Sequence, residues 1–186
     1  AMEPPALIEA DSVANEKVKV LKSILPVDRE HVVFGQYGKG MMGNEVVPGY
    51  LTEHGVAPNS NTETFVAAKL SINNWRWQGV PFFLRTGKRM ARKMTRIVVT
   101  FKRPPVAMFD TYGACLFTQN RLELLLQPDE GFNLTVEVKQ PGSGLQLQTQ
   151  RMHFRYADAF GKLPEAYQTL LLDAARGDRT LFVRSD

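Results

Sequence analysis

Alternating apolar and polar residues mark the second half of the chain as a series of β-strands. In residues 132–139, Phe, Leu, Val and Val alternate with Asn, Thr, Glu and Lys, which is typical of a strand with one face in water. Shorter β-branched or aromatic runs bounded by Gly or Pro predict further strands. These runs are residues 31–37, 64–75, 81–86, 94–102, 121–126 and 145–154.

Two segments instead have helical spacing. In residues 11–25 the apolar positions Val13, Val20, Leu21 and Ile24 recur every three or four residues, and Pro26 ends the helix. Residues 164–175 begin with a proline, carry an acidic residue in the first turn and stop before Gly177. Because most strands follow one another without a helix between them, we predict an α+β fold with a large, mainly antiparallel sheet and helices packed on one face.

Residues 38–61 show no sustained period and contain several Gly and Pro residues, so they are predicted to form a long loop. The Gly38-Lys39-Gly40 turn is a weak candidate for a phosphate cradle, because it lacks the flanking strand, helix and full glycine fingerprint.

Length and composition indicate an ordinary soluble protein. With 186 residues, 44% apolar and 23% charged, we expect a single domain over residues 1–186 that has a sizeable core and buries roughly 70% of its unfolded surface. No apolar run approaches the roughly 20 residues that span a bilayer, so no membrane role is expected. The single cysteine, Cys115, excludes an internal disulfide, and no signal peptide is recognisable, which favours a cytoplasmic location.

The two ends of the sequence suggest a piece of a longer protein. The opening residues AMEPP are typical of a linker that follows a preceding segment. The closing Ser185-Asp186 pair is of the kind that caps the start of a helix, which would lie beyond the last residue. We therefore expect truncation at both ends.

The strongest functional signal is a basic segment, residues 85–103. It contains eight Lys or Arg residues and no Asp or Glu: Arg85, Lys88, Arg89, Arg92, Lys93, Arg96, Lys102 and Arg103. Gly87 is expected to supply a positive φ at a turn between two strands. Such charge can also serve only solubility at strand edges. A nucleic-acid or other polyanion-binding module is a further alternative, but the segment lacks the aromatic residues that stack on single strands, apart from Phe101.

The motifs LRTGKRMARK, IVVTFKRPP and NRLELLLQPDEG resemble the C-terminal domain of the glucose-6-phosphate dehydrogenases, and the resemblance runs nearly end to end. In this family an N-terminal Rossmann domain and a C-terminal α+β domain hold the substrate between them. The resemblance implies that Lys88 and Lys93 contact the phosphate of glucose 6-phosphate and that Gln127 reaches its sugar. A dianion suits compact cations, and sugar hydroxyls suit an amide that both donates and accepts.

The resemblance also implies what the chain lacks. The family oxidises glucose 6-phosphate to 6-phosphogluconolactone with NADP in the pentose phosphate pathway, and its NADP fingerprint and catalytic His-Asp pair would precede Ala1. We therefore expect no catalytic and no cofactor-binding residue here, an inert piece, and a homodimer or tetramer formed through the sheet. A second, structural NADP occurs in animal members; Arg85 matches one of its residues, but Met94, Val98 and Leu125 stand at others, so this site is expected to be absent.

No metal site is predicted. His31, His54 and His153 are far apart in sequence, and no His, Cys, Asp or Glu cluster has the spacing of metal ligands.

Overall fold

The computed structural model describes residues 1–104, 118–142, 146–161 and 166–186, so Cys115 lies outside the described residues. The chain divides into two compact units, and the expectation of a single domain stays a prediction. Unit 1 comprises Ala1–Ala91 and Ala166–Asp186, and unit 2 comprises Arg92–Glu165. Each unit is described by itself.

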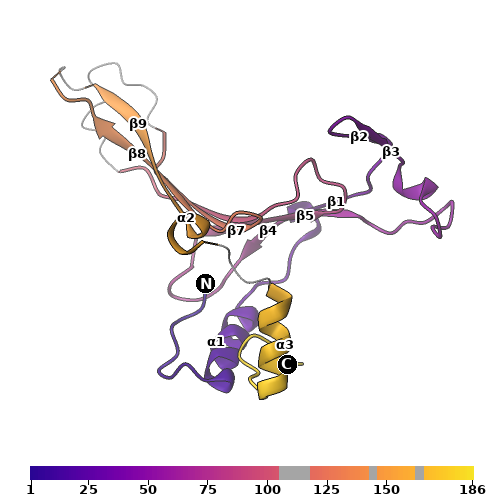
Figure 1. Ribbon diagram of the computed structural model, residues 1–186, viewed down its shortest axis with the longest axis horizontal. Helices are drawn as coiled ribbons and strands as arrows, with labels where there is room; N and C mark the ends of the chain where they lie inside the picture. The colour runs from indigo at the N-terminus through magenta and orange to yellow at the C-terminus, as the bar shows by residue number, and fades with distance from the viewer. Residues whose placement is uncertain (105–117, 143–145, 162–165) are drawn as a thin grey trace. The chain divides into compact units, whose positions relative to one another are not determined.

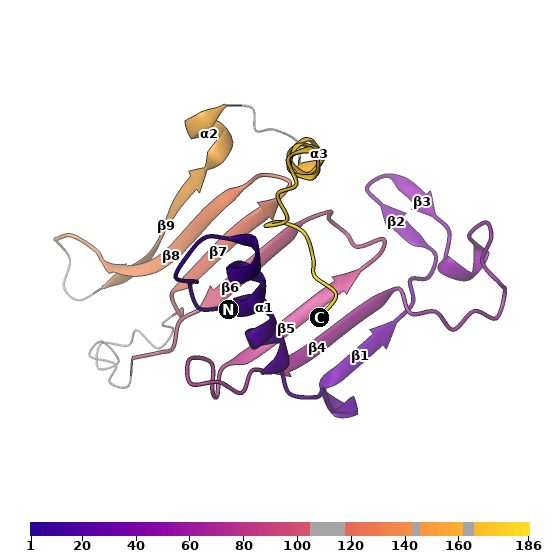
Figure 2. The same cartoon turned by 90° about the horizontal axis from the view of Figure 1, so that it is seen from below.

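Unit 1 is built on a three-stranded antiparallel sheet with the order β1-β4-β5 (Figure 2). The strands are β1 (Val32–Gly35), β4 (Phe65–Ser71) and β5 (Pro81–Gly87). Helix α1 (Ala10–Lys22) is joined to the end of β4, because Leu25 N donates to Ser71 O over 2.9 Å and Ile24 forms a bridge with the buried Ile72. Helix α3 is described over Ala166–Arg176, and its predicted start at Pro164 lies outside the described residues. The 3-10 helix η1 (Arg29–His31) precedes β1.

Residues 38–61 are more ordered than the predicted loop. They form a hairpin of β2 (Gly40–Met42) and β3 (Glu45–Val47) beyond the end of β1, followed by the 3-10 helix η2 (Tyr50–Thr52) (Figure 1). The ends of this segment are tied together, because Gln36 Nε2 donates to the carbonyls of Ser60 and Thr62. Strands of three residues are too short to show a period, which is why the sequence pattern missed them.

Unit 2 is a four-stranded antiparallel sheet in sequence order, β6-β7-β8-β9 (Figure 2). The strands are β6 (Thr95–Thr100), β7 (Arg121–Gln127), β8 (Gly131–Lys139) and β9 (Leu147–Arg155), and the short helix α2 (Tyr156–Phe160) follows β9. The prediction of an α+β class with antiparallel strands is confirmed. The sequence predicted one large sheet, whereas the described strands are hydrogen-bonded in three sheets.

One face of the unit 2 sheet carries a polar network that takes one residue from each strand. Arg96 Nη1 lies 3.7 Å from Glu123 Oε1, and Glu123 Oε2 accepts a hydrogen bond of 3.1 Å from Asn133 Nδ2. Arg155 Nη2 in turn donates to Asn133 Oδ1 over 3.0 Å. Asn133 is buried, so these bonds satisfy both ends of its amide.

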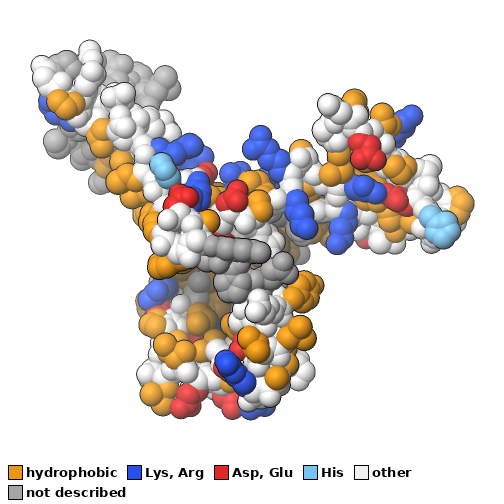
Figure 3. All heavy atoms as spheres, viewed as in Figure 1, with side chains coloured by type: hydrophobic (Ala, Val, Ile, Leu, Met, Phe, Trp, Pro, Cys, Tyr) orange, Lys and Arg blue, Asp and Glu red, His pale blue; other side chains and the backbone are white. Residues whose placement is uncertain are grey.

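The opposite face of this sheet is apolar and largely uncovered. The strand register places Ile97 beside Leu124, Phe132 and Phe154, and Val99 beside Leu122, Leu134 and Met152. Ile97 is 50% exposed and Met152 is 53% exposed. Hydrophobic side chains lie on the surface of both units (Figure 3).

The expected sizeable core is therefore wrong for this chain alone. Among the described residues, only Val47 and Ile72 are buried hydrophobic side chains. Composition supplies enough apolar side chains for a core, but it does not specify what covers the faces on which they lie. Across the described ranges, no helix has the length and apolar character needed to cross a membrane.

Candidate functional site

The predicted site residue in unit 1 lies in the turn that follows β5. Lys88 comes directly after the last residue of this strand, and its backbone N–H donates to Thr64 O over 2.8 Å. Its side chain is exposed. The predicted role of Gly87 is wrong, because the positive φ in this turn, 52°, belongs to Arg89. Glycine is needed at 87 for close packing: a Cβ there would lie 2.9 Å from the Phe65 ring and 3.2 Å from Thr64 O.

Arg89 is held by an acidic residue from the hairpin segment. Its Nη2 donates to Glu53 Oε1 over 2.8 Å, and the same oxygen accepts a hydrogen bond of 3.2 Å from the Tyr37 hydroxyl. The hydrogen bond from Arg89 lowers the pKa of Glu53, with Tyr37 adding to the effect, and the bond to Glu53 raises the pKa of Arg89. Both shifts favour the charged forms of the two partners.

The two predicted site residues in unit 2 lie at one end of its sheet. Gln127 is the last residue of β7 and pairs with Thr95, the first residue of β6. Lys93 precedes Thr95 by two residues, so Lys93 and Gln127 belong to the same end of this strand pair. Both side chains are exposed. Unit 2 thus presents the cation of Lys93 and the amide of Gln127 where β6 begins and β7 ends. Lys88, in contrast, belongs to unit 1.

The basic segment is partly neutralised by acids from other parts of the chain. Glu53 pairs with Arg89, and Glu123 pairs with Arg96. For the remaining six cations of the segment, the described residues provide no ion pair. Repulsion is therefore relieved in two places, and Lys88 and Lys93 are among the cations that keep an uncompensated charge.

The backbone of the Gly38-Lys39-Gly40 turn packs closely against Gly49. A Cβ on Gly49 would lie 3.0 Å from Lys39 N and 3.2 Å from the carbonyl carbon of Gly38, so Gly49 packs directly against this backbone. The phosphate-cradle interpretation of this turn stays a prediction.

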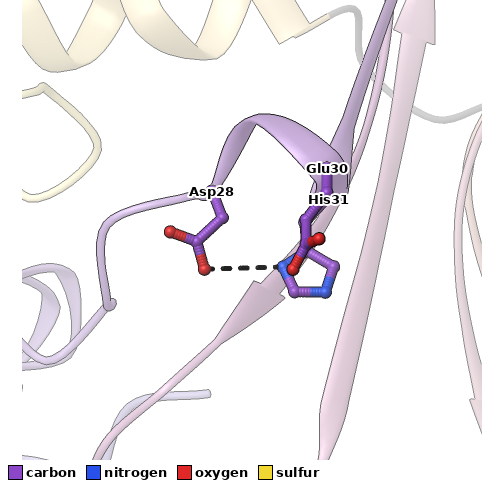
Figure 4. Close-up of side chains that lie close together, drawn as sticks. All are labelled: Asp28, Glu30 and His31. Atoms are coloured by element: carbon purple, nitrogen blue, oxygen red, sulfur yellow. Dashed lines mark ion pairs between the residues drawn. The ribbon is translucent and has the colours of Figure 1, made fainter.

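One group of possible metal ligands exists that sequence spacing did not predict. Asp28, Glu30 and His31 lie around η1, with ligand atoms within 4.8 Å of one another (Figure 4). Asp28 Oδ2 is 3.8 Å from His31 Nδ1. Two ligand atoms that each lie about 2.0–2.2 Å from one zinc ion would be roughly 3.3 Å apart. The Asp28 and His31 atoms are farther apart than that, at 3.8 Å. The acidic members are exposed, and the expectation of no metal site stays a prediction.

The expected absence of a second NADP site also stays a prediction. Val98 is paired across the strands with Glu123, so an acid already lies on that part of the polar face. Met94 and Val98 are both more than one-third exposed and offer no charge to a phosphate.

The fold and these residues define a class: an α+β domain of antiparallel sheets with exposed lysines beside strand ends. The family model described as "Glucose-6-phosphate dehydrogenase, C-terminal domain" matches residues 1–186. The chain therefore belongs to the glucose-6-phosphate dehydrogenase family, as its C-terminal domain, and both units are parts of that domain.

Relatives and solved structures agree with this assignment. Glucose-6-phosphate 1-dehydrogenases from Mycolicibacterium smegmatis and Aggregatibacter actinomycetemcomitans are 48% and 46% identical over all of this chain, which spans 38% of each relative's length. A structure of a glucose-6-phosphate dehydrogenase in complex with its substrate glucose-6-phosphate superposes with a TM-score of 0.86 at 35% identity, covering 99% of this chain and 37% of that one. The Mycobacterium avium enzyme gives 0.81 at 33% identity, covering 99% of this chain and 37% of that one.

Proposed function

We propose that this chain is the substrate-binding and dimerisation part of an enzyme that oxidises glucose 6-phosphate to 6-phosphogluconolactone with NADP in the pentose phosphate pathway, in the cytoplasm. The observation that carries the proposal is the family match over the whole chain, together with a neighbouring structure whose substrate is glucose 6-phosphate. NADP would be bound by an N-terminal domain outside this chain. The alternative of a nucleic-acid or polyanion module has no such support.

Lys88 and Lys93 would hold the substrate's phosphate, and Gln127 its sugar. The phosphate is a dianion that needs compact donors, and both lysines are exposed cations that the described part of the chain leaves unpaired. Gln127 carries an amide that donates to one hydroxyl and accepts from another. Binding the phosphate and the ring at separate points fixes the orientation of C1, where hydride leaves.

The chemical step itself would depend on groups outside this chain. Oxidation at C1 requires a base for the hydroxyl proton and an acceptor for the hydride, and we assign no residue here to either role. The test compares the complete two-domain enzyme with this chain alone. The complete enzyme should form NADPH from NADP and glucose 6-phosphate, and the chain alone should form none. NADPH formation by the pure chain, or none by the complete enzyme, would overturn the proposal.

We further propose that the apolar face of the β6-β7-β8-β9 sheet binds a second copy of the protein. This face exposes Ile97, Val99, Phe132 and Met152, and interfaces of about 800 Å² per partner are typical of stable pairs.

Val99→Lys should shift the complete enzyme toward monomer, because a charge would be buried where two sheets meet. Thr100→Lys is the matched control, since the next residue of β6 lies on the opposite, polar face. Light scattering gives the mass of each variant. A monomeric parent enzyme, or equal masses for both variants, would contradict the assignment.

A further inference from the structure

The backbone on both sides of Lys88 is fixed by contacts that converge on one part of unit 1. Before Lys88, Gly87 packs against the ring of Phe65. At Lys88 itself, the backbone N–H is bonded to the carbonyl of Thr64. After Lys88, the chain enters a left-handed conformation at Arg89, which a residue with a side chain rarely adopts. Such a conformation persists only where its surroundings hold it in place.

The group that holds Arg89 is Glu53, and Glu53 is itself fixed by Tyr37. The Arg89 guanidinium and the Tyr37 hydroxyl donate to the same carboxylate oxygen, over 2.8 and 3.2 Å. Tyr37 is anchored through its N–H to Thr64 Oγ1 over 3.0 Å and by edge-to-face contact with Tyr50 at 5.7 Å between ring centroids. Thr64 therefore bonds to Tyr37 with its side chain and to Lys88 with its carbonyl.

The ion pair between Glu53 and Arg89 also determines which cation of the turn is available to bind an anion. A guanidinium bonded to a carboxylate has its charge compensated, whereas the described residues offer Lys88 no such partner. Arg and Lys bind phosphate with different geometry, so a released Arg89 would compete with Lys88 for the same ligand. The Glu53 carboxylate thus fixes the turn and also keeps the Arg89 guanidinium from competing with Lys88 for the anion.

We propose that Glu53 is a positioning residue for substrate binding, which acts through Arg89 to hold the Lys88 turn and to keep the Arg89 guanidinium away from the phosphate. This inference rests on the proposed function, in which Lys88 binds the phosphate of glucose 6-phosphate. Tyr37 supports Glu53 in this role.

The test uses steady-state kinetics of the complete enzyme with Glu53→Gln, Arg89→Gln and the double variant. Each should raise KM for glucose 6-phosphate by about two- to fivefold, the size expected for loss of a partly exposed ion pair, with kcat and KM for NADP unchanged. The double variant should be no worse than either single one, because both remove the same link. Tyr37→Phe, which keeps the ion pair, should raise KM less. The matched control is Glu3→Gln, which breaks the ion pair of 2.6 Å with Arg76 elsewhere in unit 1 and should leave KM unchanged.

The outcomes separate this inference from the function on which it rests. A lower KM in Glu53→Gln would mean that the released Arg89 binds the phosphate itself, and an unchanged KM would mean that the turn needs no such support; either result overturns the positioning role. If Lys88→Ala raises KM while Glu53→Gln does not, the proposed function survives and this inference fails. If Lys88→Ala leaves KM unchanged, both fail. Thermal unfolding of Glu53→Gln and Tyr37→Phe, each compared with Glu3→Gln, identifies a variant that acts only through lost stability.

Discussion

In the complete enzyme, Lys88→Ala and Lys93→Ala should each raise KM for glucose 6-phosphate by about ten- to a hundredfold while kcat stays close to that of the parent. A hydrogen bond to a charged group contributes roughly 1.5–3 kcal/mol, which corresponds to this range. The phosphate keeps its charge throughout oxidation at C1. A lysine that touches it therefore stabilises the ground state and the transition state alike, and its loss appears in KM.

The control for this prediction uses both a second substrate and a second lysine. Unphosphorylated glucose should be oxidised equally poorly by the parent and by both variants, because it offers no phosphate to lose. Lys102→Ala removes another exposed cation of the basic segment, and it should leave KM for both sugars unchanged. Equal losses for the two sugars, or an effect of Lys102→Ala as large as that of Lys88→Ala, would contradict specific phosphate binding by Lys88 and Lys93.

Gly131→Ala should be the most damaging small substitution in unit 2. Gly131 begins β8, and a Cβ at this position would collide with the backbone carbonyl oxygen of Phe154 and lie 3.1 Å from the Cα of Arg155, both on β9. Because backbone atoms cannot move aside without breaking the β8–β9 pairing, we expect a loss of about 3 kcal/mol in the free energy of unfolding. This corresponds to roughly a hundredfold change in the folding equilibrium.

Gly142→Ala provides the matched comparison. Gly142 also has a positive φ, 80°, but a Cβ there would meet nothing within 4 Å. It should cost only about 1 kcal/mol, through backbone strain alone. Thermal unfolding of the complete enzyme followed by circular dichroism compares the two variants. Equal midpoints would show that the contact with β9 is not the cause of the loss.

The parts of the fold that could be predicted from sequence are those with a long, regular pattern. Residues 132–139 alternate strictly and form strand β8 as expected, but the expected wet and covered faces are not observed, because Asn133 is buried while Phe132 is exposed. The hairpin of β2 and β3 was missed because three residues carry no period. The size of the core was overestimated for a different reason. Alternation along a strand predicts an apolar face, but it does not specify which element, if any, packs on that face.

The candidate site divides in a similar way. Lys88, Lys93 and Gln127 were found because they lie in motifs that resemble a family, not because of their chemistry alone. The link between Glu53 and Arg89 had no signal in the sequence, since the two residues are 36 positions apart and neither belongs to a local pattern. The sequence singled out Gly87 for a positive φ, whereas the structure shows that its small size is what matters.

A crystal structure of the complete enzyme with glucose 6-phosphate bound would show directly whether Lys88 and Lys93 hold the phosphate. We expect phosphate oxygens at hydrogen-bonding distance, about 2.7–3.2 Å, from the Nζ atoms of both lysines, with a sugar hydroxyl bonded to the amide of Gln127. A bound substrate whose phosphate is held entirely by other residues, with Lys88 and Lys93 left in solvent, would contradict it.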